Sequence, residues 1–343
     1  MKNSILKKFL FLFSKKIPNN FFIKITRRKI LLPFYHTISD VKLPHISNLY
    51  SIRNTKLFLK DLEYFCKFYK AISINELFEI TSNNKILKKP VFHMSFDDGL
   101  KEFYTVIAPI LEKKGIPATV FLNTDFIDNK KLFFRYKVSL IIEKINSKKE
   151  KFILKDFDEI FKINFKNKDT LLKKLLSIKY KEKFILEKIA KKININFNDF
   201  LCKNQPYLNK IEIKNLLNRG FTIGSHTLDH PNLKELNFQN QKIQIFKSFE
   251  FLKKEFFLKE KYFSFPFSDD EIKIELFNYL YNVENCKMSF GISGLKDDFS
   301  KFNLHRIPME NNNKSAEEII KFEYFYFILK YFLKKNKIKR KKY

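Results

Sequence analysis

Two short clusters hold the side chains of this sequence that are best suited to chemistry. Asp97 and Asp98 stand side by side before Gly99, one of only six glycines, and His226 and His230 lie four residues apart. A divalent metal accepts a carboxylate and two imidazoles as ligands, and a second carboxylate beside them could take a proton from water. Each cluster alone has a plainer interpretation, since Asp-Asp-Gly is a common turn sequence and surface histidines pair by chance.

Geometry decides whether these side chains can share one site. Neighbouring residues of a strand point to opposite sides, so Asp97 and Asp98 can face one site only if the chain turns sharply at Gly99. One helical turn would bring His226 and His230 to the same side. The elements around both clusters therefore matter as much as the residues.

Short apolar segments alternate with helical stripes along the chain. Runs rich in β-branched and aromatic residues predict strands at 30–35, 91–96, 118–122, 221–223 and 262–267. Apolar residues spaced by three and four predict helices at 58–69, 103–111, 211–218 and 245–256. This alternation is typical of a parallel sheet covered by helices, open or closed into a barrel, with functional side chains at the carboxyl ends of the strands. Both clusters follow predicted strands directly, which favours the metal interpretation.

We expect one domain with an insertion, and a further segment on each side of that domain. Between about residues 131 and 207 the strand pattern gives way to Lys-rich amphipathic helix, so we expect a helical insertion within one domain of residues 30–310. A basic segment, 1–29, precedes this domain. A C-terminal helix and basic tail, 311–343, follow it, and the block 334–342 is typical of a disordered interaction tail.

The two clusters, in this order, resemble the motifs of the polysaccharide deacetylase family, also called carbohydrate esterase family 4 or the NodB-homology domain. Residues 95–99 are similar to its first motif, Thr/Ser-Phe-Asp-Asp-Gly, and residues 226–230 to its second, His-Ser/Thr-x-x-His. Weaker similarities lie at 35–37, 115–119 and 265–267. The resemblance covers roughly residues 31–310 and implies an α/β fold, a distorted (β/α) barrel.

The resemblance also implies an activity and a role for each matching residue. It implies a metal-dependent N-deacetylase that hydrolyses the acetamide of an N-acetylated sugar in a glycan or glycolipid precursor. Asp98, His226 and His230 would bind a divalent metal, most often Zn²⁺, and Asp97 would act as general base. The backbone N–H of Phe267 would stabilise the oxyanion. A metal would polarise the carbonyl and lower the pKa of water.

Departures from the family pattern leave other roles open. Residues 262–270 contain no Arg that could support Asp97, and the chain has no Trp for the family's fourth motif. In 304–308, His305 is a candidate for protonating the leaving amine, and Arg306 is a candidate for steadying a carboxylate or binding substrate. His36 could line the sugar site or bond within the core. His93, inside a predicted strand, is expected to pack.

The charge balance identifies no partner by itself. The chain has 67 Lys and Arg against 37 Asp and Glu, a net charge of +30. These lysines are scattered from end to end and accompany many Ile, Asn and Phe, all encoded by A- and T-rich codons, so a solvated Lys-rich surface is the leading interpretation. Nucleic-acid binding is not expected, because no reading motif is present. Three widely separated cysteines indicate neither a disulfide framework nor a zinc site.

Location and alternative functions are inferred from weaker signals. The apolar run 9–13 is shorter than a secretory signal, so we expect a cytoplasmic protein that touches the anionic inner face of the membrane through its basic tail. Residues 322–333 predict an aromatic helix that lies on a membrane or packs on the domain. Alternative functions are a same-site hydrolase of another amide or imide, and a catalytically dead glycan- or membrane-binding protein. Retention of Asp97 argues against the dead protein, since binding needs no base.

Overall fold

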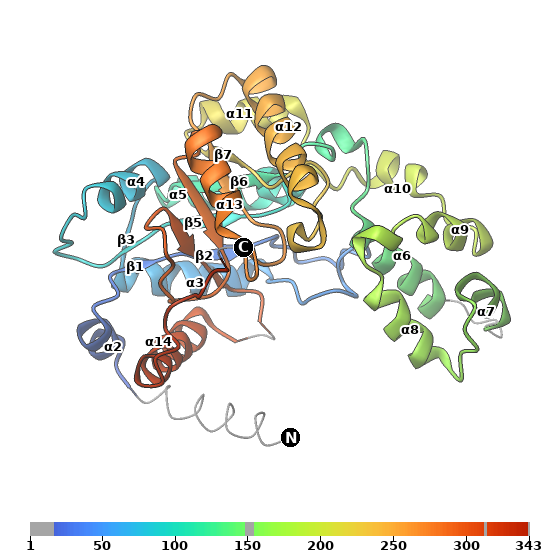
Figure 1. Ribbon diagram of the computed structural model, residues 1–343, viewed down its shortest axis with the longest axis horizontal. Helices are drawn as coiled ribbons and strands as arrows, with labels where there is room; N and C mark the ends of the chain where they lie inside the picture. The colour runs from blue at the N-terminus through green and yellow to red at the C-terminus, as the bar shows by residue number, and fades with distance from the viewer. Residues whose placement is uncertain (1–16, 148–153, 312–313, 342–343) are drawn as a thin grey trace.

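The computed structural model describes residues 17–147, 154–311 and 314–341, and its core is an eight-stranded parallel sheet (Figure 1). The strand order is β10-β9-β8-β7-β6-β5-β2-β11. The strands are β2 (Pro33–Tyr35), β5 (Met94–Phe96), β6 (Ala118–Leu122), β7 (Thr222–Ser225), β8 (Tyr262–Ser264), β9 (Met288–Gly291), β10 (Asn303–His305) and β11 (Ile307–Pro308). The strand predicted at 118–122 is present with the same ends, those at 30–35 and 91–96 are each divided into two, and those at 221–223 and 262–267 have shifted ends. Strands β9, β10 and β11 were not predicted.

One short segment closes this sheet into a barrel. Residues 303–308 pair with β9 through β10 and with β2 through β11, at the opposite edges of the sheet. A smaller sheet, β1 (Ile30–Leu31), β4 (Val91–Phe92) and β3 (Lys70–Ala71), continues two of the strands towards their amino ends. The predicted distorted barrel is confirmed. Among the described strands β1 and β10 do not pair, so one seam stays open in the amino-terminal half.

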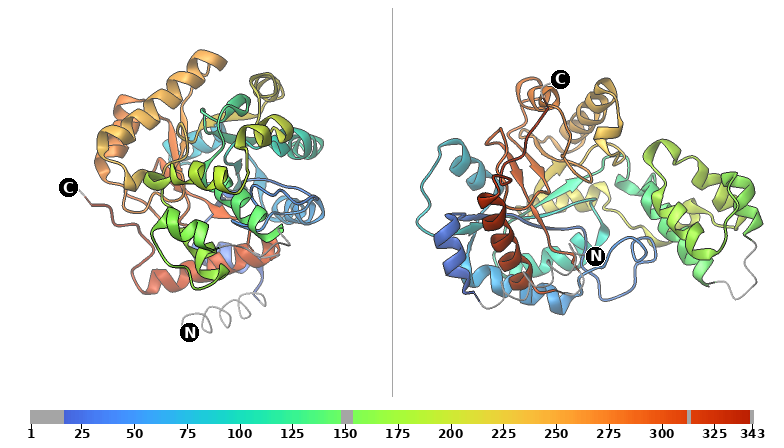
Figure 2. Two further views of the ribbon diagram at one scale, coloured as in Figure 1. Left: turned by 90° about the vertical axis from the view of Figure 1, so that its right-hand side faces the viewer. Right: turned by 60° about the horizontal axis from the view of Figure 1, so that its bottom comes forward.

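Helices cover the outside of the barrel (Figures 1 and 2). They are α2 (Asn19–Thr26), α3 (Thr55–Phe68), α4 (Ile74–Ser82), α5 (Ala108–Lys113), α11 (Lys210–Asn218), α12 (Phe238–Phe256), α13 (Ile274–Asn278) and α14 (Ala316–Phe332). The predicted stripe at 58–69 falls on α3, whose Phe58, Leu62 and Phe65 are fully buried. The stripe at 103–111 begins as a π-helical turn, Phe103–Ile107, and becomes α-helical only in α5.

Five helices between β6 and α11 form a lobe at one side of the barrel (Figure 2). They are α6 (Phe134–Ser147), α7 (Lys155–Phe161), α8 (Lys168–Ser177), α9 (Ile185–Lys192) and α10 (Phe197–Asn204). The lobe has its own hydrophobic cluster, which includes Tyr136, Ile141, Leu171 and Ile189. Each helix is too short to be stable alone, so this shared cluster holds the lobe together.

The C-terminal helix packs on the barrel. Tyr324 of α14 is fully buried and stacks on Phe22 of α2, with ring centroids 5.9 Å apart. Of the two interpretations of 322–333, the structure shows the packed helix, with Phe332 exposed at its end. Among the described residues, no helix is both long enough and apolar enough to cross a membrane.

The basic tail is ordered over its described part, so the expectation of a disordered tail is wrong there. Asp297 donates its N–H to the carbonyl of Asn336 and accepts from the N–H of Ile338. Arg340 forms ion pairs with Asp269 and Asp298, and its side chain is 1% exposed. Two buried carboxylates thus anchor the tail to the barrel.

Candidate active site

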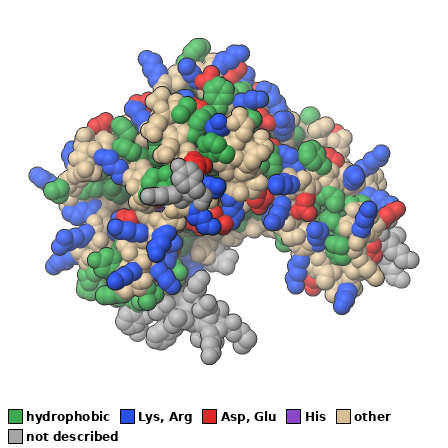
Figure 3. All heavy atoms as spheres, in the orientation of Figure 1, with side chains coloured by type: hydrophobic (Ala, Val, Ile, Leu, Met, Phe, Trp, Pro, Cys, Tyr) green, Lys and Arg blue, Asp and Glu red, His purple; other side chains and the backbone are tan. Residues whose placement is uncertain are grey.

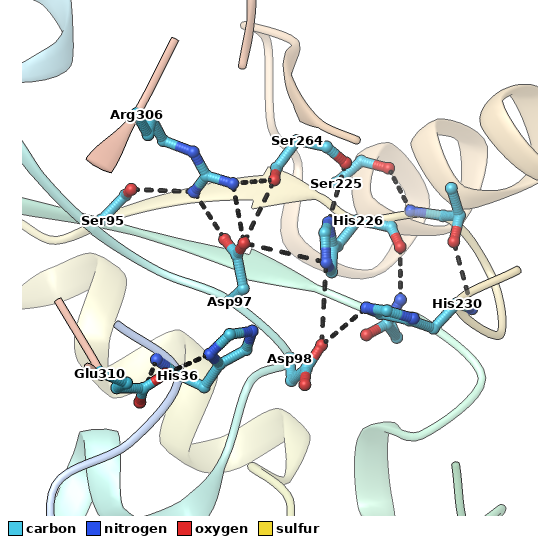
Figure 4. Close-up of polar contacts among 12 residues, drawn as sticks. His36, Ser95, Asp97, Asp98, Ser225, His226, His230, Ser264, Arg306 and Glu310 are labelled. Atoms are coloured by element: carbon cyan, nitrogen blue, oxygen red, sulfur yellow. Dashed lines mark hydrogen bonds and ion pairs between the residues drawn. The ribbon is translucent and has the colours of Figure 1, made fainter. Parts of the chain in front are cut away.

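The side chains singled out by the sequence meet at the carboxyl ends of the barrel strands (Figure 4). Asp97 and Asp98 follow β5, His226 follows β7, and Arg306 lies between β10 and β11. The sharp turn after β5 begins at Asp98, with a φ of 71°, and continues at Gly99, with a φ of 64°. This left-handed turn turns Asp98 away from Asp97 and towards the histidines.

Asp98, His226 and His230 form a buried group that fits a cation. The Oδ1 atom of Asp98 lies 3.3 Å from Nε2 of His230 and 3.7 Å from Nε2 of His226. One ligand atom from each of the three residues lies within 4.8 Å of the other two. Asp98 Oδ1 is buried and has no hydrogen-bond partner. A divalent cation would supply that missing partner, and two imidazoles with one carboxylate suit Zn²⁺.

A loop, not a helical turn, brings the two histidines together. Residues 226–232 form no helix, and both Thr227 (φ 71°) and His230 (φ 59°) adopt the left-handed conformation. The Oγ1 atom of Thr227 accepts the N–H of His230 at 3.2 Å, and His226 Nδ1 lies 2.8 Å from the Ser264 carbonyl oxygen. These contacts leave Nε2 of His226 facing Asp98.

Burial keeps both imidazoles neutral. Desolvation lowers the pKa of His226 to about 4 and that of His230 to about 3. Metal ligation requires an unprotonated imidazole. At neutral pH both histidines are therefore in the state that can bind a metal.

Arg306 holds the neighbouring Asp97 in its charged form. Its Nη1 and Nη2 atoms donate to the two carboxylate oxygens of Asp97, each at 2.7 Å, and it also donates to the hydroxyls of Ser95 and Ser264. Burial alone would raise the pKa of Asp97, but the charge and hydrogen bonds of Arg306 outweigh it and hold that pKa well below its ordinary value. An arginine therefore does support Asp97, but it comes from residue 306, between β10 and β11, and not from the segment 262–270.

His36 lies across the group, after β2, and is paired with Glu310 (Figure 4). Its Nδ1 is 2.5 Å from Glu310 Oε2, while Glu310 Oε1 accepts the backbone N–H groups of His36 and Thr37. Desolvation would lower the pKa of His36, but Glu310 outweighs it and raises that pKa to about 9. The aspartates act in the same direction, Asp98 more than Asp97. At neutral pH His36 is therefore a proton-bearing group that faces the two aspartates.

The structure does not bring His305 into this group. Neighbouring strand residues point to opposite sides, and because Arg306 points into the barrel, His305 points outward. Its Nε2 lies 2.9 Å from Asp298 Oδ2, and its side chain is fully buried. With Asp269, Asp298 and Arg340 around it, His305 belongs to the anchor of the tail. His93 packs in the core, bonded to the carbonyl of Ile72 and the hydroxyl of Thr119.

Aromatic side chains border the Asp-His-His group. Strand β8 ends at Ser264 and does not continue to 267 as predicted, and Phe267 has a φ of 60°. The Phe267 ring centroid lies 4.7 Å from that of His230. From the helical lobe, the Phe133 ring lies 4.4 Å from His230. The hydroxyl of Tyr136 donates to Asp98 Oδ2 at 2.9 Å. The lobe therefore reaches the Asp-His-His group itself.

Sequence reasoning missed three residues of this site. Tyr136 looks like any buried position of an amphipathic helix, and nothing in its own segment relates it to residue 98. Ser264 interrupts the apolar run 262–267 at its midpoint, which was a usable signal for a polar contact. Glu310 follows the last motif by two residues, and only the pairing of β11 with β2 places it beside His36.

Comparisons with known proteins agree with this geometry. The family model for polysaccharide deacetylase matches residues 84–156 and 183–278. The fold is similar to three solved structures: Streptococcus pyogenes deacetylase PplD in complex with acetate (18% identity, 86% of this chain and 98% of that chain, TM-score 0.55), IcaB from Ammonifex degensii (12%, 87% and 97%, 0.52) and a de-N-acetylase from Aggregatibacter actinomycetemcomitans (14%, 85% and 99%, 0.53). No curated protein matches.

The family match shows a hydrolase of carbon–nitrogen bonds other than peptide bonds. The chain belongs to the polysaccharide deacetylase family. The family match is interrupted at 157–182, within the helical lobe, and it does not include residues 30–83 or 279–310 of the domain.

Proposed function

We propose that the protein removes the acetyl group from an N-acetylated saccharide, with Zn²⁺ held by Asp98, His226 and His230. The observation that carries this proposal is the pair of aspartates at the end of β5. Asp97 is kept charged by Arg306, while Asp98 turns a buried, unpartnered oxygen towards two neutral imidazoles. A binding protein would gain nothing from burying a charged base beside a cation site.

The residues support a division of labour for amide hydrolysis. When bound, the metal would polarise the acetamide carbonyl and lower the pKa of water. Asp97 accepts a proton from the attacking water, the hydroxide oxygen bonds to the carbonyl carbon, and the backbone N–H of Phe267 stabilises the negative oxygen. The C–N bond then breaks, the amide nitrogen takes a proton, and acetate and a free amine leave.

We propose His36, rather than His305, as the proton donor for the leaving amine. His36 faces the two aspartates and carries a proton at neutral pH because Glu310 stabilises its charged form. His305 is sealed outside the barrel against Asp298. A general acid must reach the substrate nitrogen, and of these two histidines it is His36 that lies on the side of the sheet where Asp97 and Asp98 are.

Acetate release from N-acetylglucosamine oligomers tests the proposal. We expect release that chelator abolishes and Zn²⁺ restores, and an Asp97→Asn variant that loses at least about a hundredfold in kcat. His36→Gln should lose on the order of a hundredfold while His305→Gln, if it folds, keeps most of the activity. Release that survives chelator would contradict the metal role, and a larger loss in His305→Gln than in His36→Gln would contradict the choice of acid.

A further inference from the structure

A basic groove lies outside the open seam of the barrel, and Asp97, Asp98, His226 and His230 are not among its lining residues. Its volume is about 1190 Å³, and Ile30 and Leu32 line it on one side of the seam and Asn303 and Leu304 on the other. In Figure 3, Lys and Arg side chains gather at the lower left, over α2 and the strand after it. The groove therefore lies where β1 and β10 do not pair with each other.

The lining of this groove is more basic than the protein as a whole. Nine of its 28 lining residues are Lys or Arg and two are Asp, whereas Lys and Arg make up 67 of all 343 residues. These cations come from four parts of the chain: the end of α2 with the residues after it, the loop after α4, the loop between β9 and β10, and the C-terminal tail. Convergence from separate elements distinguishes the groove from a single basic helix face.

Most of these cations have no carboxylate partner within the part of the chain that the structure describes. Both acids of the groove are already used, Asp297 by Arg28 and Asp298 by Arg340 and His305. No ion pair within 4.0 Å joins a described carboxylate to five other lining residues, namely Lys24, Arg27, Lys85, Lys88 and Lys337. At physiological salt the screening length is about 8 Å, so charges around one groove still repel one another. A bound anion would relieve that repulsion.

A second groove shows the contrast. It lies between the helical lobe and the barrel, has a volume of about 680 Å³ and is also rich in Lys. Four of its five lysines pair with neighbouring carboxylates, in the pairs Lys130–Asp128, Lys131–Asp125, Lys137–Glu187 and Lys183–Asp229. A Lys-rich composition alone therefore does not produce unpaired cations in a groove.

We propose that the groove at the open seam binds a phosphate-bearing ligand. Guanidinium and ammonium groups that surround a cavity suit the several oxygens of a phosphate. The phosphate could belong to a soluble molecule or to a lipid headgroup. The adjoining Ile86, which is 91% exposed, offers an apolar contact beside the charges.

The test uses the full chain, two phosphate probes and two triple variants. The groove variant is Lys24→Gln, Lys85→Gln and Lys88→Gln; the control variant, Lys203→Gln, Lys214→Gln and Lys247→Gln, changes three exposed lysines elsewhere and has the same net charge. Pyrophosphate binding is measured by calorimetry, and binding to phosphatidylglycerol vesicles by sedimentation. We expect the groove variant alone to bind more weakly, by about fivefold per lysine and on the order of a hundredfold in total.

Each outcome decides something. Saturable pyrophosphate binding that only the groove variant loses assigns a soluble phosphate ligand. Vesicle binding without pyrophosphate binding, again lost only in the groove variant, assigns a lipid headgroup. Equal losses in both variants would show diffuse charge attraction and overturn the groove, as would the absence of binding to either probe. Acetate release is measured separately, so the proposed deacetylase activity stands or falls on other data.

Discussion

Glu310 sets the protonation of His36 from outside the usual motifs. One of its oxygens contacts the imidazole and the other accepts two backbone N–H groups, so the carboxylate is fixed on both sides. A carboxylate held in this way raises the pKa of the imidazole by stabilising its charged form. Glu310, two residues after the last motif, therefore determines the pH range over which His36, the proposed acid, carries its proton.

Changing this carboxylate should move the alkaline limit of activity. The raised pKa of His36, about 9, keeps it protonated at lower pH, and its proton is lost as the pH rises through that value. In Glu310→Gln the alkaline limb of kcat/KM should move to lower pH by about one unit or more. A bound cation would lower the pKa of His36 in both proteins, so the measured quantity is the difference between their pH profiles.

A matched control for this experiment is Glu63→Gln, an exposed change on α3. Its pH profile should equal that of the unchanged protein. Coincident alkaline limbs for Glu310→Gln and the unchanged protein would show that His36 is not the titrating acid.

The helical lobe is joined to the metal-binding group at two points. Tyr136 of α6 donates to Asp98, and Tyr180 and Lys183 both contact Asp229, which lies between the two histidines in sequence. Residues around a metal ligand fix its orientation. The lobe thus holds both the carboxylate and the histidine loop in position.

Removal of one hydroxyl from the lobe should weaken metal binding. Tyr136→Phe frees Asp98 Oδ2 to rotate, so affinity for Zn²⁺ should fall by about 10- to 100-fold, the usual cost of losing such a contact. Competition against a chromogenic chelator measures this affinity without reference to activity. Tyr104→Phe, on the outer side of the barrel, is the control, and an unchanged affinity in Tyr136→Phe would show that the contact is structural only.

At the scale of elements, the sequence predicts local patterns well and long-range pairing poorly. Short continuous apolar runs predicted five strands, because strands of a parallel sheet are buried on both faces. Segment 303–308 was missed since a strand that changes partner halfway has only two or three residues on each side. The helical turn at 226–230 was wrong because two left-handed residues, Thr227 and His230, adopt φ values that spacing alone does not reveal.

At the scale of the whole molecule, the tail closes the chain onto the barrel. Arg340 donates through Nε to Asp298 Oδ1 at 3.0 Å, lies over the Phe277 ring, and pairs with Asp269, which is fully buried. Desolvation alone would raise the pKa of Asp298, but His305 and Arg340 hold it well below its ordinary value. The Asp298 carboxylate therefore stays charged in the interior because His305 and the tail residue Arg340 stabilise it.

Loss of this arginine should destabilise the fold. Arg340→Ala leaves two buried carboxylates without their cation, which typically costs about 3–5 kcal/mol. Urea unfolding followed by circular dichroism measures the change. The control is Lys339→Ala at an exposed neighbouring position, which should change the free energy of unfolding by less than about 0.5 kcal/mol. Equal stability of both variants would show that the Arg340 ion pairs do not stabilise the fold.

Residues 303–308 pair with both edges of the sheet, so the fold is sensitive to insertions and deletions next to this segment. His305 and Arg306 face opposite sides, so a slip of a single residue in this segment would exchange them. The imidazole would then enter the barrel beside Asp97, and the guanidinium would enter the acidic pocket that Arg340 fills. Deletions in the loop before Asn303 should therefore be far more harmful than substitutions there. A change of register would turn Arg306 away from Asp97 and turn His305 away from Asp298.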